Sequence, residues 1–265
     1  MKSPIWNKAG GMLGFEIIPA LKGPLLWAAL GSLLLLLLPV RFLSLGEFSV
    51  NGQPVGQAYR LIYVLAVGYS TVVFLTTLFT LCLCLDRTGP HYLRNNDLLV
   101  LSRAVGRPAF YLAKMASVLL PSLVFAALGL TVLWEELFRV AGVNVYRILL
   151  LILPLALSMA CLVSLYFLMR NFLGNFMIFF LWLLLLPILY VANLWKYYGG
   201  ALREGSAHFS VVGLLPQFGG LHAHALGMVH DFFRRDESWQ AMGNGALWTA
   251  LALAAGLLVF SRKRL

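Results

Sequence analysis

Long apolar runs alternate with short polar segments along the 265-residue chain. A helix needs about 20 mainly apolar residues to cross the hydrocarbon core of a bilayer. The stretch from Leu33 to Leu38 is apolar on every side, whereas the strands of a membrane barrel alternate apolar and polar residues. The pattern therefore predicts an all-α polytopic membrane protein with six transmembrane helices, at Pro24–Leu43, Tyr59–Leu85, Met115–Phe138, Tyr146–Met169, Phe172–Leu194 and Ala246–Phe260. The last run is the shortest and needs flanking residues to complete the crossing.

The segment before the first run, residues 1–23, has a different pattern. Its apolar residues recur at helical spacing while polar residues interrupt elsewhere, which predicts an amphipathic helix lying in the membrane interface. The alternative is an irregular tail, because Gly10, Gly11, Gly14 and Pro19 all weaken a helix.

The segment before the last run, residues 195–245, is long and mixed. Its half-apolar part, from Phe209 to Phe233, contains too many Gly, Pro and His residues to cross the membrane. It can dip partway into the bilayer as a re-entrant hairpin, provided that the surrounding protein covers its backbone.

Composition and charge agree with a membrane protein. The chain is 61% hydrophobic and 11% charged, with a mean hydropathy of +0.86. Its net charge of +10 comes from Lys and Arg residues scattered between apolar runs, so the chain lacks the basic stripe of a nucleic-acid-binding protein and no nucleic-acid partner is expected. The three cysteines all lie within apolar runs, where they behave as small hydrophobic residues.

The distribution of basic residues predicts the orientation. If the amino terminus is cytoplasmic, 12 of the 20 Lys and Arg residues fall on the cytoplasmic side and 8 on the outer side. Cytoplasmic loops carry an excess of Lys and Arg in membrane proteins. Both termini are therefore predicted to face the cytoplasm, with residues 195–245 outside.

The largest cytoplasmic segment runs from Asp86 to Lys114 and carries a recognisable pattern. Three leucines, Leu98, Leu99 and Leu101, are followed by Ser102 and Arg103. The sequence then continues Ala-Val-Gly to Arg107, and Tyr111-Leu112 precede Lys114 at the start of the third span. On charge alone, a solvated cytoplasmic loop explains the segment equally well.

This run resembles the loop of permease subunits of ABC transporters of the second exporter type, which carries Leu-Leu-Ser-x-Pro-x-x-Arg, then a hydrophobic pair and a Lys. The resemblance implies that residues 1–265 form a single transmembrane permease domain, with 86–114 as a cytoplasmic loop that couples to a separate ATPase. The coupling contact would comprise Leu98, Leu99, Leu101, Ser102, Arg103, Arg107 and Lys114.

The resemblance also implies the partners. Two ATPase subunits and a second permease copy, identical or paralogous, would assemble in the cell inner membrane among its lipids. The chain has no Gly-x-x-x-x-Gly-Lys-Ser/Thr phosphate loop, so ATP and Mg²⁺ would be bound by the partner ATPase. The chain itself is then not an enzyme and carries no cofactor, and export is favoured over import.

Two alternatives come from other classes of protein. His222, His224, His230 and Asp231 lie close together in the outer segment and suggest a membrane-embedded metalloenzyme. On a helix, however, His222 and His224 project about 200° apart, so only an irregular loop would bring them together. The second alternative is a non-transporting assembly subunit.

Overall fold

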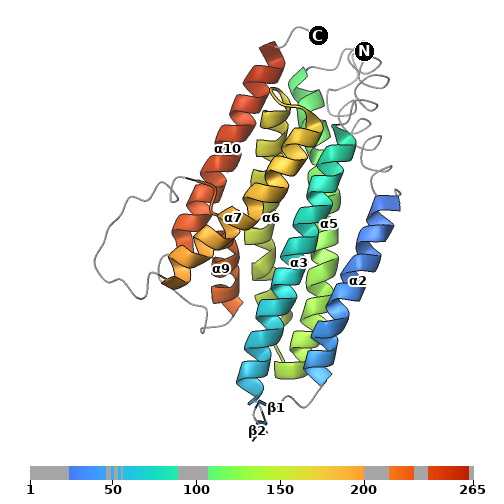
Figure 1. The fold of residues 1–265 in the computed structure, drawn as a ribbon, viewed down its shortest axis with the longest axis vertical. Coiled ribbons are helices and arrows are strands. Elements are labelled where there is room, and N and C mark those ends of the chain that lie inside the picture. The colour runs from blue at the N-terminus through green and yellow to red at the C-terminus, as the bar shows by residue number, and fades with distance from the viewer. Residues whose placement is uncertain are drawn as a thin grey trace, which may run out of the picture.

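The computed structural model describes residues 24–45, 49–50, 53–54, 56–88, 107–199, 215–229 and 238–262 (Figure 1). The predicted interfacial helix at 1–23 lies outside the described residues. So do residues 89–106 of the predicted cytoplasmic loop and residues 200–214 and 230–237 of the predicted outer segment.

Helices make up almost all of the described structure, so the predicted all-α class is confirmed. The elements in chain order are α2 (Pro24–Leu45), β1 (Ser49–Val50), β2 (Gln53–Pro54), α3 (Gln57–Arg87), α5 (Arg107–Ala141), α6 (Val145–Arg170), α7 (Asn175–Gly199), α9 (Phe218–Val229) and α10 (Ser238–Arg262). The two short strands pair antiparallel, Val50 with Gln53. Each of the six predicted apolar runs coincides with a helix. The third helix begins at Arg107 rather than Met115, and the last at Ser238 rather than Ala246.

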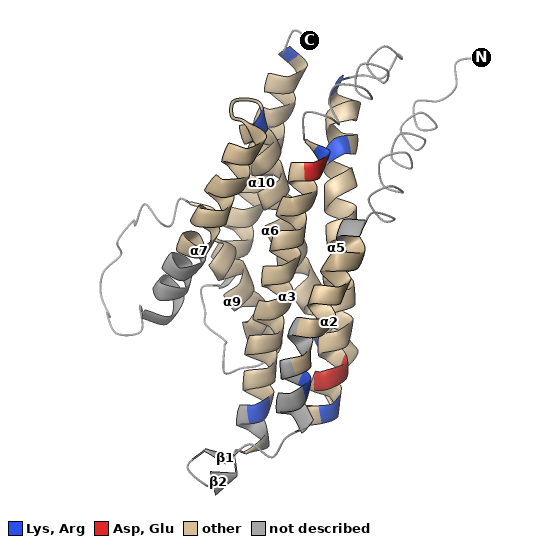
Figure 2. Ribbon diagram, turned by 45° about the vertical axis from the view of Figure 1, so that its right-hand side comes forward, with Lys and Arg blue, Asp and Glu red and all other residues tan. Residues whose placement is uncertain are grey.

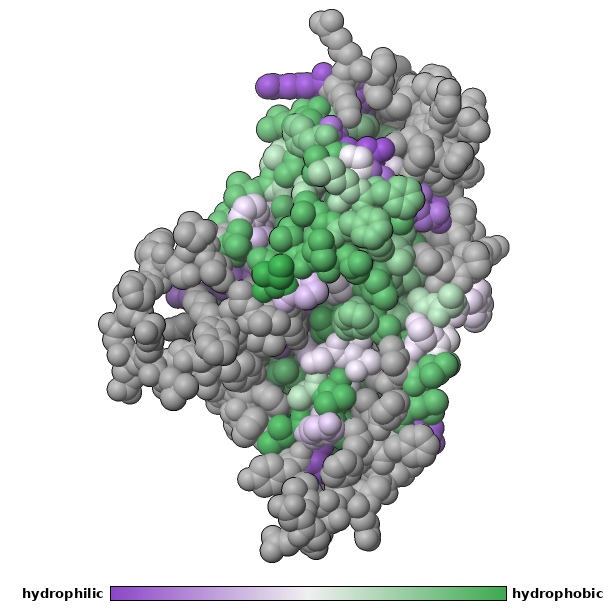
Figure 3. All heavy atoms as spheres, in the orientation of Figure 1, coloured by the Kyte–Doolittle hydropathy of each residue, from purple (hydrophilic) through white to green (hydrophobic). Residues whose placement is uncertain are grey.

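Four of the described helices are long and apolar enough to cross a membrane: Arg60–Arg87, Arg107–Val140, Val145–Arg170 and Trp239–Arg262. The described apolar parts of α2 and α7 are shorter, Leu26–Leu35 and Asn175–Leu189. The six long helices expose many large apolar side chains, such as Phe74 of α3, which is 62% exposed, and Phe180 of α7, which is 57% exposed. Figure 3 shows this apolar surface across the middle of the molecule. A soluble protein rarely exposes so large an apolar surface, whereas lipid covers it in a membrane.

The helices form an elongated bundle whose long members run alternately up and down (Figure 1). Helix α3 packs mainly on α5 and also on α2, while α10 packs mainly on α6. Helix α7 is inclined across α6 in Figure 1, and the short helix α9 lies against α6, α7 and α10. Helices α3, α6 and α10 finish at one end of the bundle, where α5 and α7 begin.

Charged residues gather at the two ends of the bundle and leave its middle apolar (Figure 2). The end at which α3, α6 and α10 finish carries Arg87, Arg170 and Arg262, and we call it the basic end. The opposite end carries an Arg139–Glu135 ion pair on α5 and the buried Glu136. This separation is the one expected of helices that cross a bilayer, since charges are costly in its core.

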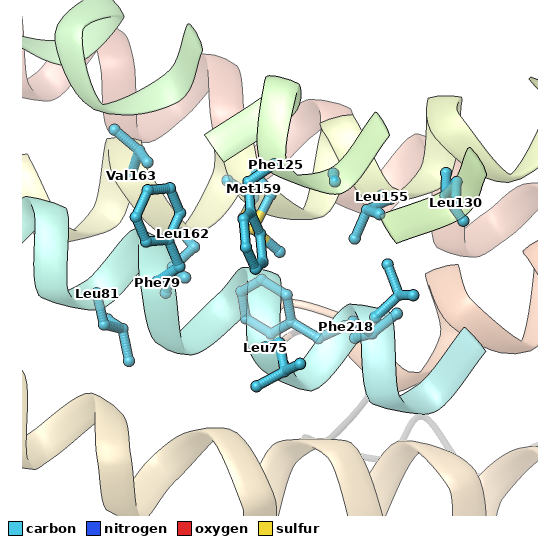
Figure 4. Packing of buried hydrophobic residues seen from close by; sticks show 14 of the residues in the cluster. Leu75, Phe79, Leu81, Phe125, Leu130, Leu155, Met159, Leu162, Val163 and Phe218 are labelled. Atoms are coloured by element: carbon cyan, nitrogen blue, oxygen red, sulfur yellow. The ribbon is translucent and has the colours of Figure 1, made fainter. Parts of the chain in front are cut away.

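Aromatic and aliphatic side chains fill the centre of the bundle. Phe79 of α3 and Phe125 of α5 lie with ring centres 4.8 Å apart, and Met159 of α6 lies close to both (Figure 4). Lipid tails are as apolar as these side chains, so close packing rather than exclusion of water holds the helices together.

Glycines allow close approach at two helix contacts. A Cβ at Gly129 of α5 would lie 3.0 Å from Cγ1 of Val72. A Cβ at Gly256 of α10 would lie 2.9 Å from Cζ of Tyr111, so α5 and α10 pack closely only because this residue has no side chain.

Candidate functional site

Two of the seven predicted coupling residues, Arg107 and Lys114, are described, and both lie in the first turns of α5. Arg107 donates from Nη1 to the backbone oxygen of Ser261 in α10, at 3.2 Å. Lys114 is 3% exposed, and its Nζ lies 5.5 Å from the centre of the Phe110 ring. The remaining five, Leu98, Leu99, Leu101, Ser102 and Arg103, lie outside the described residues.

The start of α5 is held against its neighbours at the basic end. Proline is favourable in the first turn of a helix, which explains why α5 begins at Arg107 just before Pro108. One turn further, the ring of Tyr111 packs on Phe260 of α10 and on Phe167 of α6, with ring centres 5.4 and 5.8 Å apart. The start of α5, which follows residues 89–106 in the sequence, is therefore fixed to α6 and α10.

The end of α3, just before residues 89–106, is fixed by buried hydrogen bonds. We call this set of residues, Leu85, Thr88, Tyr166, Arg170 and Asn175, the polar junction. Asn175 accepts from the Thr88 hydroxyl at 2.5 Å and from the Tyr166 hydroxyl at 3.0 Å, and its amide donates to the Leu85 oxygen at 2.8 Å. Arg170 donates from Nε to the Thr88 oxygen at 3.3 Å. These bonds join the end of α3 to the end of α6 and the start of α7.

The polar junction is nearly closed to solvent. Thr88, Tyr166 and Asn175 are 5%, 0% and 7% exposed. A buried polar group without a partner costs about 1–3 kcal/mol, so satisfying these groups holds the three helix ends in one arrangement. The sequence interpretation missed this junction. The available signal was Asn175, an amide at the start of an apolar run, but two of its three partners, Thr88 and Leu85, are 87 and 90 residues away in sequence.

A cavity of about 390 Å³ lies between α3, α6, α7 and α9. Its wall is mostly aliphatic and aromatic, and four polar side chains contribute to it: Ser70, Thr77, Ser158 and His222. None of the described residues that line it is an acid, a lysine or an arginine. Small-molecule sites commonly have this composition, an apolar wall with a few polar groups that fix orientation.

Helix α9 brings the predicted histidines into the bundle, since 10 of its 12 residues are buried. His222 and His224 are only 2% and 4% exposed. Both ends of α9 are held by neighbouring helices. The side-chain oxygen of Asn244 in α10 accepts from the Gln217 N–H at 3.1 Å, and Arg147 of α6 donates to the Val229 oxygen at 3.4 Å.

The two described histidines point to different neighbours. Nδ1 of His222 lies 3.3 Å from the Tyr69 hydroxyl of α3, whereas the His224 ring lies 5.2 Å from the Trp239 ring of α10. Burial lowers the pKa of His222 from its usual 6.5 to about 3, so its ring is neutral. Within the described residues no three His, Cys, Asp or Glu side chains come together, and His230 and Asp231 lie outside them.

Comparison with known protein families, with characterised proteins and with solved structures finds no match to this chain.

Proposed function

We propose that the chain is the transmembrane permease subunit of an ATP-driven ABC exporter. The observation that carries the proposal is that both ends of the predicted coupling loop are fixed to packed helices at the basic end. The polar junction fixes the end of α3, and Arg107 with Tyr111 fixes the start of α5. A force applied to residues 89–106 would therefore reach α6, α7 and α10 and not be lost at loose helix ends.

The leucines of the loop would then fill a groove of the ATPase, and Arg103 would pair with acidic residues on its rim. Arg107 and Lys114, which lie in α5, would pass the movement into the bundle. The sequence contains no phosphate loop, so ATP and Mg²⁺ belong to two partner ATPase subunits. A second permease copy would complete the complex in the inner membrane, and export is the favoured direction.

The six-span topology is part of this proposal. Helices α2 and α7 have 22 and 25 residues, and at about 1.5 Å per residue both reach across a hydrocarbon core of about 30 Å. With 12 residues, α9 reaches only about 18 Å, so we assign it as a re-entrant element entered from the outer side. The basic end then faces the cytoplasm, together with both termini.

Single cysteines introduced at Asn95 and at Gly205, in a chain without its three native cysteines, test this topology. A membrane-impermeant thiol reagent added to intact cells should label the cysteine at 205 only, and permeabilised cells should label both. Labelling of both positions in intact cells would exclude six spans with cytoplasmic termini.

The coupling contact is tested by co-purification with a candidate ABC ATPase expressed together with this chain and by ATP hydrolysis of the reconstituted complex. Burying a leucine side chain contributes about 1.5–3 kcal/mol, whereas an exposed ion pair contributes at most about 1 kcal/mol. Replacing Leu98 and Leu99 with Ser should therefore weaken assembly more than Arg103→Glu, which should mainly slow association and increase its sensitivity to salt. Full assembly and hydrolysis in both variants would mean that the ATPase binds elsewhere.

A further inference from the structure

The cavity between α3, α6, α7 and α9 opens on the apolar flank of the bundle. Two of its lining residues, Phe74 of α3 and Leu183 of α7, are also among the exposed ones, at 62% and 43%. They belong to the surface that lipid covers, so a molecule can enter the cavity sideways from the bilayer without passing through either end of the bundle.

Helix α7 is continuous from Asn175 to Gly199, but its ladder of backbone hydrogen bonds is interrupted at one bond in this wall. Pro187 lines the cavity and has no N–H to donate to the carbonyl of Leu183, one turn earlier, which also lines it. In membrane helices such interruptions are tolerated where other groups or a cavity lie beside the backbone. Two of the three α7 residues that line the cavity, Leu183 and Pro187, are therefore the pair between which this bond is missing.

Polar groups on the wall are neutral. Ser158 is 2% exposed and His222 is buried, with its ring oriented by the Tyr69 hydroxyl. Burial keeps the imidazole uncharged, since it lowers the pKa of His222 to about 3. An anionic headgroup would find no cation among the described lining residues, whereas a hydroxyl can donate to or accept from an imidazole or a serine hydroxyl.

We propose that this cavity is the entry site for a neutral amphiphile from the bilayer, with its hydrocarbon chain in the apolar part and an uncharged hydroxyl group at His222 and Ser158. This inference rests on the transport function proposed above and names the class of its substrate. The volume of about 390 Å³ accommodates roughly a dozen groups the size of a water molecule, enough for a substantial length of hydrocarbon chain. All the described residues that line the site belong to one permease copy.

The test uses the purified full chain in phospholipid nanodiscs and a hexadecanol that carries a diazirine in its chain. After photolysis, mass spectrometry of the peptides should find the label on the cavity segments of α3, α6 and α7. Hexadecanol should compete for this labelling better than hexadecane or hexadecanoate. A hydrogen bond of about 1 kcal/mol corresponds to a roughly three- to tenfold advantage over the hydrocarbon. Equal competition by all three compounds, or a stronger effect of the anion, would overturn the assignment.

Two tryptophan variants locate the site. Thr77→Trp fills the cavity wall and should remove most of the labelling, whereas Thr131→Trp makes the same change at an exposed position of α5 and should leave it unchanged. Uniform labelling of exposed helix faces, insensitive to Thr77→Trp, would show only general lipid contact and refute the proposal. No ATPase or ATP is present, so failure of the transport function would leave this result intact, and failure here would leave the coupling contact untouched.

Discussion

Replacing Asn175 with Ala should loosen the contact between the end of α3 and the start of α7. The substitution removes three side-chain hydrogen bonds, to Thr88, Tyr166 and Leu85, each worth about 0.5–1.5 kcal/mol net. The full sum overstates the loss. The Thr88 hydroxyl can donate its one proton to the Cys84 oxygen at 2.6 Å instead, and the Tyr166 hydroxyl can donate its proton to the backbone oxygen of residue 175 at 3.3 Å.

We therefore expect Asn175→Ala to lower the free energy of unfolding by about 1–2 kcal/mol, somewhat more than the average of about 0.6 kcal/mol for hydrogen bonds between membrane helices. For a chain of this size, 1 kcal/mol corresponds to about 2–4 °C in Tm. Thermal unfolding of the purified protein in detergent, followed by tryptophan fluorescence, measures the shift.

Asn171→Ala is the matched control, because it removes the same amide four residues earlier. Asn171 follows the last residue of α6, and its amide donates to the Phe167 oxygen of that helix at 3.3 Å. Its loss should change Tm less than Asn175→Ala does. A double-mutant cycle with Thr88→Val should give a coupling energy of about 0.5 kcal/mol or more between Thr88 and Asn175. Equal Tm shifts for the two Asn variants, together with an additive cycle, would refute the idea that the polar junction fixes the end of α3.

Two further changes test the packing of α10 and the burial of α9. Gly256→Ala should lower the free energy of unfolding by about 1–3 kcal/mol, because the new Cβ meets the Tyr111 ring. The control is Gly31→Ala, whose new Cβ meets nothing within 4 Å, and it should leave Tm unchanged or raise it. Equal Tm values for the two variants would contradict this contact. The folded state keeps His222 neutral down to about pH 3, while the unfolded chain protonates it below its usual pKa of 6.5. The free energy of unfolding should therefore fall by up to about 1.4 kcal/mol per pH unit below pH 6.5, and His222→Gln should remove this part of the pH dependence. Identical changes in Tm between pH 7 and pH 5 in the parent protein and in His222→Gln would show that His222 does not contribute.

The sequence predicted most of the helices because their signal is local. Helix α6 was predicted within one residue at each end, since apolar residues fill it and Arg170 closes it. Helix α9 was not predicted as a buried helix. Gly219, Gly220 and two histidines lower its helical and apolar character, so it depends on its contacts with α6, α7 and α10 and on the His222–Tyr69 contact with α3.

The candidate site was less predictable from sequence. The coupling loop stays a prediction from its motif and its charges, whereas the polar junction depends on pairs such as Leu85 and Asn175, which the fold alone brings together. Lys114 is a residue whose burial the sequence pattern does not indicate. A lysine at the edge of an apolar run indicates a solvated position, whereas the start of α5 at Arg107 carries Lys114 into the bundle.

The position of α9 has a consequence for biosynthesis. A 12-residue segment with two histidines is too short to insert in a bilayer by itself as a spanning helix. Its contacts include α10, and the Gln217 N–H at its start is satisfied by Asn244, which is synthesised later. The support that α10 gives to α9 therefore forms only after the ribosome has released α10, later than the contacts of α9 with α6 and α7. We expect that termination before residue 238 would leave the start of α9, and the cavity wall beside it, without this support.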